Sequence, residues 1–320
     1  MFSIRPFQAT DADYAGIAAV EIAIYPENGN TVENFIHEDT SREPERFFQR
    51  WVVEEDDRII AFAQAQQQIH SSTPGRYRFG IDVHPDFQTR GVGTAVYQTI
   101  WQTLQTCDPQ PVILESGCYQ HFPQAMRFLE KRGFQQVMRW VITRLELPEF
   151  DMALFEPLIA RLKAQGITFA TLPELQQHDE HWLEALHELD WQLTQDEPLP
   201  YTPQKMPKEQ FRKLFIESPV LLPDGWIVAV ENGRYVGNSN VEKGTLPGGL
   251  STGFTGVLRD YRRRGLATAL KALSIEWARQ AGYRFIRTGN EENNPMLTLN
   301  KKLGFREITA SLAYERQWRL

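Results

Sequence analysis

Two stretches of the chain alternate between β-branched or aromatic residues and small or polar ones around a tight turn. The first is RWVVEEDDRIIAFAQAQ at residues 50–66, where Asp56-Asp57 separates two apolar runs. The second is WIVAVENGRYVGNSNV at residues 226–241, where Asn232-Gly233 has the same place. Two β-rich runs joined by two turn-forming residues are typical of a β-hairpin. We therefore predict one hairpin in each half of the chain.

The spacing of apolar positions predicts the same succession of elements after each hairpin. In the first half a helix at 11–24, with Asp11 as its N-cap, precedes the hairpin. The hairpin is followed by strand 77–83, helix 92–105, strand 111–116, helix 123–132 and strand 134–145. The second half repeats this order with strand 250–257, helix 266–281, strand 283–288, helix 294–303 and strand 305–318. The succession predicts a mixed α/β fold.

The two halves are also similar residue by residue. VHPDFQTRGVGT at 83–94 aligns with VLRDYRRRGLAT at 257–268, an offset of 174 residues (257 minus 83). Further on, AMRFLEKRGF at 125–134 aligns with MLTLNKKLGF at 296–305, an offset of 171 residues (296 minus 125). A period this long is not that of a solenoid, so the pattern indicates two copies of one domain.

The boundary between the copies is predicted after the strand WVITRLEL at 140–147. The segment 148–165 has apolar residues at helical spacing and is followed by Gly166, a typical residue just beyond a helix C-terminus. We therefore predict an N-terminal domain at 1–147 (copy one), a linker helix at 148–165 and a C-terminal domain at 166–320 (copy two).

Composition and charge narrow the function classes. Hydrophobic residues make up 42% of the 320, and the net charge is −7. The first value is typical of a globular protein, and the second disfavours nucleic-acid binding, which needs a broad basic surface. Cys107 and Cys118 form no metal-binding pattern, so we expect no metal site. No signal sequence or run of about 18 apolar residues is present, so we expect a cytoplasmic protein without a membrane partner.

A glycine-containing turn lies between a strand and a helix in both copies. An α-helix leaves its first backbone N–H groups unpaired and has a partial positive charge at its N-terminus. A phosphate accepts these hydrogen bonds when no side chain intervenes. Gly91 and Gly265 lack a Cβ at the turn, and Thr94 and Thr268 add a hydroxyl donor. The turns therefore predict two phosphate-binding loops, neither of the Walker A nor of the GxGxxG type.

QTRGVG (88–93) and RRRGLA (262–267) resemble the acetyl-CoA-binding motif Gln/Arg-x-x-Gly-x-Gly/Ala of the GNAT N-acetyltransferases. The resemblance covers both halves, and the family has the order of elements predicted above. It implies two tandem copies of an acyl-CoA N-acyltransferase fold, each a central splayed sheet of mixed α/β type flanked by helices. This layout is that of the family's tandem members.

The resemblance also implies where the cofactor, acetyl-CoA, is bound. Pantetheine enters the gap beside the strand that precedes the loop, and the pyrophosphate lies on the loop amides. The expected contacts in copy one are Val83, His84, Gln88, Thr89, Arg90, Gly91, Val92, Gly93 and Thr94. In copy two they are Val257, Leu258, Arg259, Arg262, Arg263, Arg264, Gly265, Leu266, Ala267, Thr268 and Asn293.

The family's later motif, Asn-x-x-Ala-x-x-Leu-Tyr-x-Lys-x-Gly-Phe, is kept unequally. Copy two has Asn293 at the asparagine position and Asn300 in place of the tyrosine that acts as general acid. Copy one has Phe122 and Leu129 there, so we predict that it is degenerate or binds cofactor without turnover, and that copy two is catalytic. Asn300, Tyr314 or water remains as the source of the proton for the leaving thiolate.

The general base is open as well, because strand 250–257 has no carboxylate. An amine must lose a proton before it attacks a thioester. Candidates for the base come from loops expected to face the acceptor: Glu291, Glu292, Asp190 and Glu188 in copy two, and Glu21 and Glu27 in copy one.

Together these features predict an N-acetyltransferase that moves acetyl from acetyl-CoA to an amine of a small molecule by direct attack on the thioester. A non-catalytic acyl-CoA sensor is the alternative, favoured by the missing tyrosine in both copies. A nucleic-acid-binding protein using Arg259 and 262–264 is a further rival that the acidic net charge disfavours.

Overall fold

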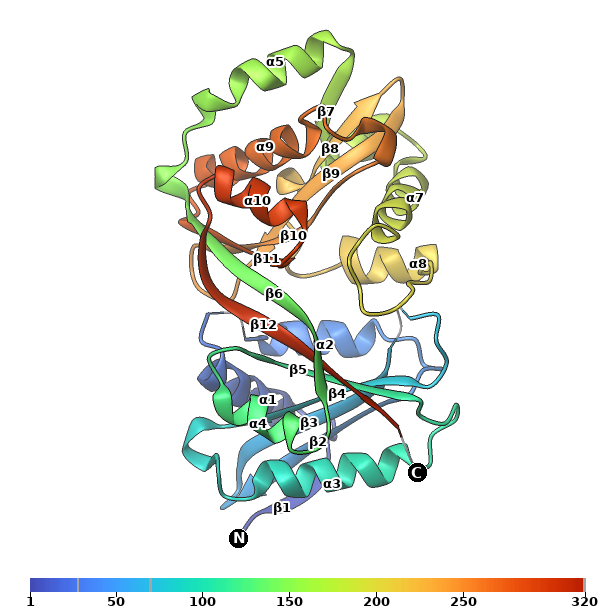
Figure 1. The fold of residues 1–320 in the computed structure, drawn as a ribbon, viewed down its shortest axis with the longest axis vertical. Helices are drawn as coiled ribbons and strands as arrows, with labels where there is room; N and C mark the ends of the chain where they lie inside the picture. The colour runs from blue at the N-terminus through green and yellow to red at the C-terminus, as the bar shows by residue number, and fades with distance from the viewer. Residues whose placement is uncertain (28, 69–70, 319–320) are drawn as a thin grey trace. The chain divides into compact units, whose positions relative to one another are not determined.

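The structure is a computed structural model that describes residues 1–27, 29–68 and 71–318 (Figure 1). The chain forms two compact units. Unit 1 contains Met1–Arg139, Pro200–Gln204 and Ser311–Leu320, and unit 2 contains Trp140–Leu199 and Lys205–Ala310. Each unit combines a largely antiparallel sheet with helices, which confirms the mixed α/β fold class predicted from the sequence.

Copy one begins with a short strand and two helices and continues with the predicted hairpin. Its elements are β1 (Ser3–Pro6), α1 (Asp11–Ile24), α2 (Val32–Thr40), β2 (Phe48–Glu55), β3 (Arg58–Gln67), β4 (Arg76–Val83), α3 (Val92–Leu104), β5 (Ile113–Tyr119), α4 (Pro123–Glu130) and β6 (Gln135–Glu146). In unit 1 the strands follow the order β1-β2-β3-β4-β5. The core includes Ile100, Leu114 and Phe79, in contact between α3 and the sheet.

The rest of the chain repeats this pattern after the linker. Its elements are α5 (Glu156–Ala164), β7 (Ile167–Thr171), α6 (Leu172–His178), α7 (Trp182–Thr194), α8 (Lys208–Phe211), β8 (Ile227–Glu231), β9 (Arg234–Lys243), β10 (Gly249–Val257), α9 (Leu266–Gln280), β11 (Phe285–Glu291), α10 (Pro295–Lys302) and β12 (Arg306–Gln317). In unit 2 the strand order is β11-β10-β9-β8-β7. No helix among the described residues is long and apolar enough to cross a membrane.

The first helix starts as predicted, but its capping residue is different. The side chain of Thr10 accepts a hydrogen bond from the backbone N–H of Asp13, so Thr10 is the N-cap and Asp11 is the first helical residue. The prediction of Asp11 as N-cap was therefore wrong. Both residue types satisfy the free N–H groups of a helix start, and sequence alone does not separate two such neighbours.

The last strand of each copy belongs to the sheet of the other unit. Residues 311–317 of β12 pair antiparallel with β5 in unit 1. Residues 140–146 of β6 pair antiparallel with β11 in unit 2. The domain boundaries predicted at 147 and 166 divide the chain in sequence order, and they stay a prediction. The compact units differ from this division because each contains part of the other copy's last strand.

One strand pair in each unit is parallel and short. β4 pairs with β5 only from Arg76 to Arg78 among the described residues, although β4 continues to Val83. β10 likewise pairs with β11 only from Gly249 to Ser251 and continues to Val257. Beyond these pairs the strands part, which leaves unpaired backbone groups beside each glycine loop.

The linker helix α5 is part of the core of unit 2. Leu162 is fully buried and Ile159 nearly so, and both pack with Leu266 of α9 and Ile167 of β7. Gly166 follows the helix with a φ of +89°, the left-handed conformation that glycine adopts most easily.

Strand exchange leads to a testable stability difference along β12. We expect Leu312→Ala to lower the free energy of unfolding by about 2–5 kcal/mol, because Leu312 is buried in the core of unit 1. Ile308→Ala on the same strand should cost about 1 kcal/mol or less, because Ile308 is 44% exposed. Urea denaturation measures both. Equal effects of the two substitutions would contradict the burial of Leu312 in the core of unit 1.

Candidate functional site

The two glycine loops have the same backbone. Thr89 and Arg263, two residues before the glycines, both have a φ of +61°. Gly91 and Gly265 follow with φ values of +87° and +94°, and α3 and α9 begin at the next residue. A side chain is strained at such φ values, so the glycines are required by the backbone. Each turn directs the free N–H groups of a helix start toward the end of the preceding strand.

A side chain from each loop closes the turn onto that strand. Gln88 Nε2 donates to the carbonyl oxygen of Val83 at 3.0 Å. Arg262 Nε donates to the carbonyl oxygen of Val257 at the same distance of 3.0 Å. These two residues were predicted to contact the cofactor, and in the structure they hold the loop in shape. The different side chains explain why the sequence alignment alone gave no sign of this shared role.

Copy one has an open cavity beside its loop. The cavity has a volume of about 400 Å³ and lies between the parting strands β4 and β5. Ile81 and Val83 line it from β4, Gly117 from β5, and Phe128 from α4, and the loop residues Gly91, Gly93 and Thr94 also line it. A Cβ added at Gly91 would meet no atom within 4 Å, so the N-terminus of α3 is accessible. A phosphate-bearing ligand with an apolar arm fits this combination of surfaces.

In copy two the linker helix covers the equivalent loop. A Cβ added at Gly265 would lie 2.7 Å from a methyl group of Leu158 in α5. Arg161 of α5 donates from Nη2 to the carbonyl oxygen of Arg264 at 3.1 Å. The rings of Phe150 and Phe155 stack at 5.4 Å and pack with the hydrophobic core next to α9. The linker of the protein therefore contacts the glycine loop of copy two, whereas no such contact is made at Gly91 of copy one.

The arginines of the second loop are mostly neutralised. Asp196 pairs with both Arg259 and Arg262. These partners, the hydrogen bond from Arg259 first, hold the pKa of Asp196 below its ordinary value. Arg264 pairs with Glu231 at 3.2 Å. Arg263 is exposed, and no ion pair to it occurs in the described part of the chain.

The other predicted contact residues are divided between backbone and side-chain positions. Val92 and Leu266 are buried at the start of their helices and can offer only backbone groups, as can Leu258. Arg90 pairs with Glu55, and the ring of His84 caps the turn at Asp86. Thr268 lines a groove with Phe155, Ala267 lies beside the covered Gly265, and the Asn293 amide donates to Glu291.

The candidate catalytic residues of copy two are not gathered in one place. Asn300 is fully buried, and its amide donates to the Asn290 side chain at 2.5 Å. Glu292 is exposed. Tyr314 lies in unit 1, in the exchanged part of β12, where its hydroxyl donates to Glu130 at 3.2 Å. The strand exchange thus separates Tyr314 from the copy to which the chain order assigned it.

A carboxylate that sequence reasoning missed lines the open cavity of copy one. Asp82 is the last residue but one of β4 and accepts a hydrogen bond from the Tyr25 hydroxyl at 3.0 Å. Burial raises the pKa of Asp82 to about 6, while this hydrogen bond lowers it. The aligned residue of copy two is Gly256, so the alignment of the two copies gives no sign of this carboxylate. A carboxyl group poised near neutral pH at a cavity wall can accept a proton.

Two more carboxylates lie behind Asp82. Burial raises the pKa of Glu21 to about 7, and the charges of Asp82 and Glu38 raise it further. Burial also raises the pKa of Glu38. Glu21 Oε1 accepts the backbone N–H of Asn30 at 3.0 Å. Asp82, which lines the cavity, together with Glu21 and Glu38, which do not, forms the acidic side of the cavity.

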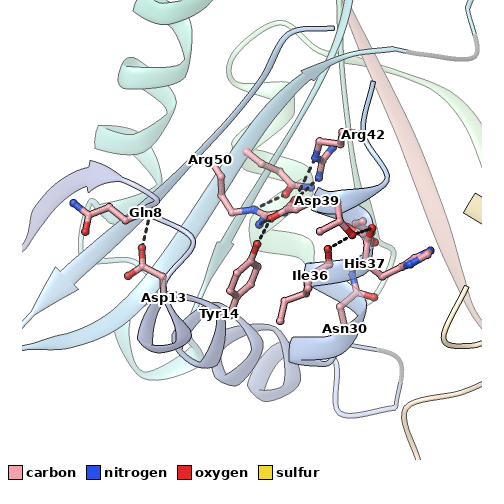
Figure 2. Close-up of polar contacts among 12 residues, drawn as sticks. Gln8, Asp13, Tyr14, Asn30, Ile36, His37, Asp39, Arg42 and Arg50 are labelled. Atoms are coloured by element: carbon pink, nitrogen blue, oxygen red, sulfur yellow. Dashed lines mark hydrogen bonds and ion pairs between the residues drawn. The ribbon is translucent and has the colours of Figure 1, made fainter. Parts of the chain in front are cut away.

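A network of polar contacts holds α2, the helix that carries Glu38. Asp39 accepts hydrogen bonds from Arg50 at 2.8 Å, from Arg42 at 3.0 Å and from the Tyr14 hydroxyl at 3.0 Å. Figure 2 shows Arg50, Arg42 and Tyr14 directed toward Asp39. Because the Arg50 side chain is fully buried, this network fixes α2 against α1 and β2. It therefore positions the acidic side of the cavity.

Comparisons with known proteins agree with this geometry. The model of the acetyltransferase (GNAT) family matches residues 15–134 and again residues 183–305. No sequence among the curated proteins matches the chain.

Three similar solved structures illustrate the fold. A tandem GNAT protein from the clavulanic acid biosynthesis pathway, without AcCoA, is 17% identical with a TM-score of 0.75, covering 99% of this chain and 98% of its own. A GCN5-related N-acetyltransferase from Sphaerobacter thermophilus is also 17% identical, with a TM-score of 0.69 and coverages of 100% and 96%. Saccharomyces cerevisiae N-myristoyltransferase with bound myristoyl-CoA is 11% identical, with a TM-score of 0.64 and coverages of 100% and 79%.

At these identities the solved structures show the fold alone, but the family matches do more. They cover both copies, each including a glycine loop, and together span more than half of the chain. The predicted resemblance is confirmed: this chain belongs to the acetyltransferase (GNAT) family as a tandem two-domain member, and is an acyltransferase that uses acyl-CoA.

Proposed function

We propose that this protein is an acetyl-CoA-dependent N-acetyltransferase that acetylates an amine of a small molecule, and that copy one carries the working site. The observation that supports this most is the open cavity of copy one, which joins an accessible glycine loop to the Asp82 carboxylate. The family and the names of its solved members support acetyl as the acyl group.

Our preference for copy one departs from the sequence, which favours copy two through Asn293. The motif residue Asn293 is present in copy two, yet Leu158 and Arg161 of the linker lie on its glycine loop. A loop that the linker contacts at its glycine, and whose arginines are mostly paired with carboxylates, has less free positive charge for a phosphate. Accessibility therefore outweighs the motif.

The residues of copy one divide the work between binding and proton transfer. The amides from Gly91 to Gly93 would hold the diphosphate, and Ile81 and Val83 would contact the pantetheine arm. Bound acetyl-CoA supplies the activated acyl group. Asp82 accepts a proton from the acceptor amine, and Tyr25 orients the Asp82 carboxylate through its hydrogen bond. A thiolate of ordinary pKa near 8.5 needs only a weak acid or water to regain its proton.

The acidic side of the cavity supports an amine as the acceptor. Asp82 places a carboxyl group at the cavity wall, where a cationic amine would approach, and the charges of Asp82 and Glu38 both act on the nearby Glu21. The ring of Tyr25 packs edge-to-face with those of Tyr119 and Phe122, which adds aromatic surface suited to an ammonium group. These groups lie inside the protein rather than on a flat surface, which suits a small molecule better than a folded protein.

The number of CoA molecules bound per chain tests whether copy one is the working site. Isothermal titration calorimetry should find one CoA per chain, and Gly91→Asp should abolish binding because it places a carboxylate where the diphosphate is held. Gly166→Asp is the matched control: its φ of +89° and open surroundings equal those of Gly91, but it lies beyond the linker helix. It should leave CoA binding unchanged. Binding that survives Gly91→Asp and is lost in Gly265→Asp would assign the site to copy two instead.

The second prediction concerns pH. With saturating amine, kcat should rise as pH increases through about 6, because Asp82 acts as a base only when it is ionised. Asp82→Asn should remove this rise and lower kcat by about 10²–10⁴-fold. In the native protein the hydrogen bond from Tyr25 lowers the pKa of Asp82. Tyr25→Phe removes this bond, so the pKa of Asp82 should increase and the rise in kcat should move to higher pH.

Two controls make the pH experiment specific. Tyr14→Phe removes a tyrosine hydroxyl from α1, the helix that ends just before Tyr25. This hydroxyl donates to Asp39 and not to Asp82, so the midpoint should stay in place. Glu21→Gln should keep the acidic limb, since the residues lining the cavity include Asp82 but not Glu21. An acidic limb that disappears with Glu21→Gln and survives Asp82→Asn would transfer the role of base to Glu21. CoA binding without thiol release for any amine would favour the sensor function.

A further inference from the structure

Two arginines beside α3 have no carboxylate partner in the part of the chain that the structure describes. They are Arg132, which follows α4, and Arg316 on the exchanged part of β12. Other arginines of unit 1, including Arg5, Arg50 and Arg90, are bound to carboxylates. In an acidic protein, two guanidinium groups that lie beside the same helix without a carboxylate partner need an explanation.

Arg132 lies directly beside the glycine loop. Its Nη2 donates to Thr94 Oγ1 at 3.0 Å, and its Nη1 donates to the carbonyl oxygen of Phe128 at 3.0 Å. The guanidinium group stacks over the ring of Phe128 at 3.6 Å. Thr94 is in the first turn of α3, and Phe128 lines the cavity of copy one. The cation is therefore held at the mouth of the cavity, next to the free N–H groups of the helix.

Arg316 continues the same surface along α3. Its Nη1 is 3.5 Å from the Tyr97 hydroxyl, and its guanidinium carbon is 4.8 Å from the centre of the Trp101 ring. Tyr97 also contacts Arg132, whose guanidinium carbon is 4.9 Å from its ring centre. Arg316 borders a second cavity of about 400 Å³, lined by Tyr97, Gln98, Trp101, Gln102 and Arg316. Tyr97 thus connects the loop arginine with a pocket further along the helix.

Copy two has none of these groups at the equivalent positions. Leu303 aligns with Arg132, Lys271 with Tyr97 and Ile275 with Trp101, by the offsets of 171 and 174 residues. Leu145 occupies the place of Arg316, since β6 pairs with β11 as β12 pairs with β5. Leu145, Ile275 and Leu303 belong to a buried core that includes Phe150. The arginines are therefore a property of copy one and not of the fold.

We propose that Arg132 and Arg316 bind the two phosphate groups at the nucleotide end of CoA, Arg132 the diphosphate and Arg316 the 3′-phosphate. This inference rests on the proposed function of copy one. The spacing along α3 supports it: Thr94 and Trp101 are seven residues apart, about 10 Å along a helix, so a ligand held at both must be extended. Guanidinium groups bind phosphate through paired N–H donors.

The strand exchange is what brings Arg316, the proposed contact to the 3′-phosphate, to α3. Only four residues follow Arg316 in the sequence, yet it is placed beside α3 because residues 311–317 pair with β5. Nucleotide recognition by copy one therefore depends on a residue supplied by the end of copy two. A chain that lacked this exchange would keep the glycine loop and lose the contact to the 3′-phosphate.

The test compares CoA with 3′-dephospho-CoA by isothermal titration calorimetry. Arg132→Leu should weaken both ligands by a similar factor of about 10–100, because both contain the diphosphate. Arg316→Leu should weaken CoA by about tenfold or more and leave 3′-dephospho-CoA unchanged. Both substitutions introduce the residue that copy two has at the same position. Arg316→Lys keeps the charge and should retain part of the preference for CoA.

Arg127→Leu is the matched control, because it removes an exposed arginine from α4 and should change neither affinity. The Tm of each variant is measured as well, to show that the variant is folded. A fall in 3′-dephospho-CoA affinity for Arg316→Leu would overturn the assignment of Arg316 to the 3′-phosphate. Affinities of both arginine variants equal to that of Arg127→Leu would overturn the whole inference. If the unaltered protein binds neither CoA nor 3′-dephospho-CoA, the proposed function itself fails.

Discussion

The left-handed glycine turn between a strand and a helix is the constraint from which the rest of the site follows. Gly91 and Gly265 reach φ values that other residues adopt only under strain, and each turn aims the free N–H groups of a helix at the end of a parting strand. A phosphate binds there only if nothing else satisfies or covers these groups. The backbone is therefore a precondition for cofactor binding, and accessibility decides whether the precondition is used.

The linker makes two equal backbones unequal. In copy two, Leu158 lies against Gly265 and Phe155 packs beside α9, so apolar contacts replace a ligand. In copy one the same face of α3 remains open, and Arg132 and Arg316 stay without carboxylates among the described residues. Duplication thus yields one loop that the linker contacts at its glycine and one loop without such a contact. Burial of apolar side chains stabilises the covered loop, whereas the open loop keeps the unsatisfied groups that binding requires.

Much of the fold was predictable because local patterns control it. The helix at 11–24 and the strand at 250–257 appear within a residue or so of the bounds predicted from apolar spacing. The glycine turns were predictable as well, since a glycine between a strand and a helix has few other uses. The N-cap at Thr10 was missed because two adjacent residues were both suitable. Asp82 was not predicted because its equivalent in copy two is Gly256, so the repeat does not point to a carboxylate there.

By itself the sequence determined the duplicated α/β domain, the family and the position of both glycine turns, because these depend on residue periodicity and on glycine at particular turns. The tertiary structure alone decided which loop is accessible, that residues 311–317 complete the sheet of unit 1, and that Asp82 lines a cavity. Each of these depends on contacts between residues distant in the chain, such as Leu158 with Gly265. Such contacts arise from packing in three dimensions, and a pattern along one chain does not specify which partners meet.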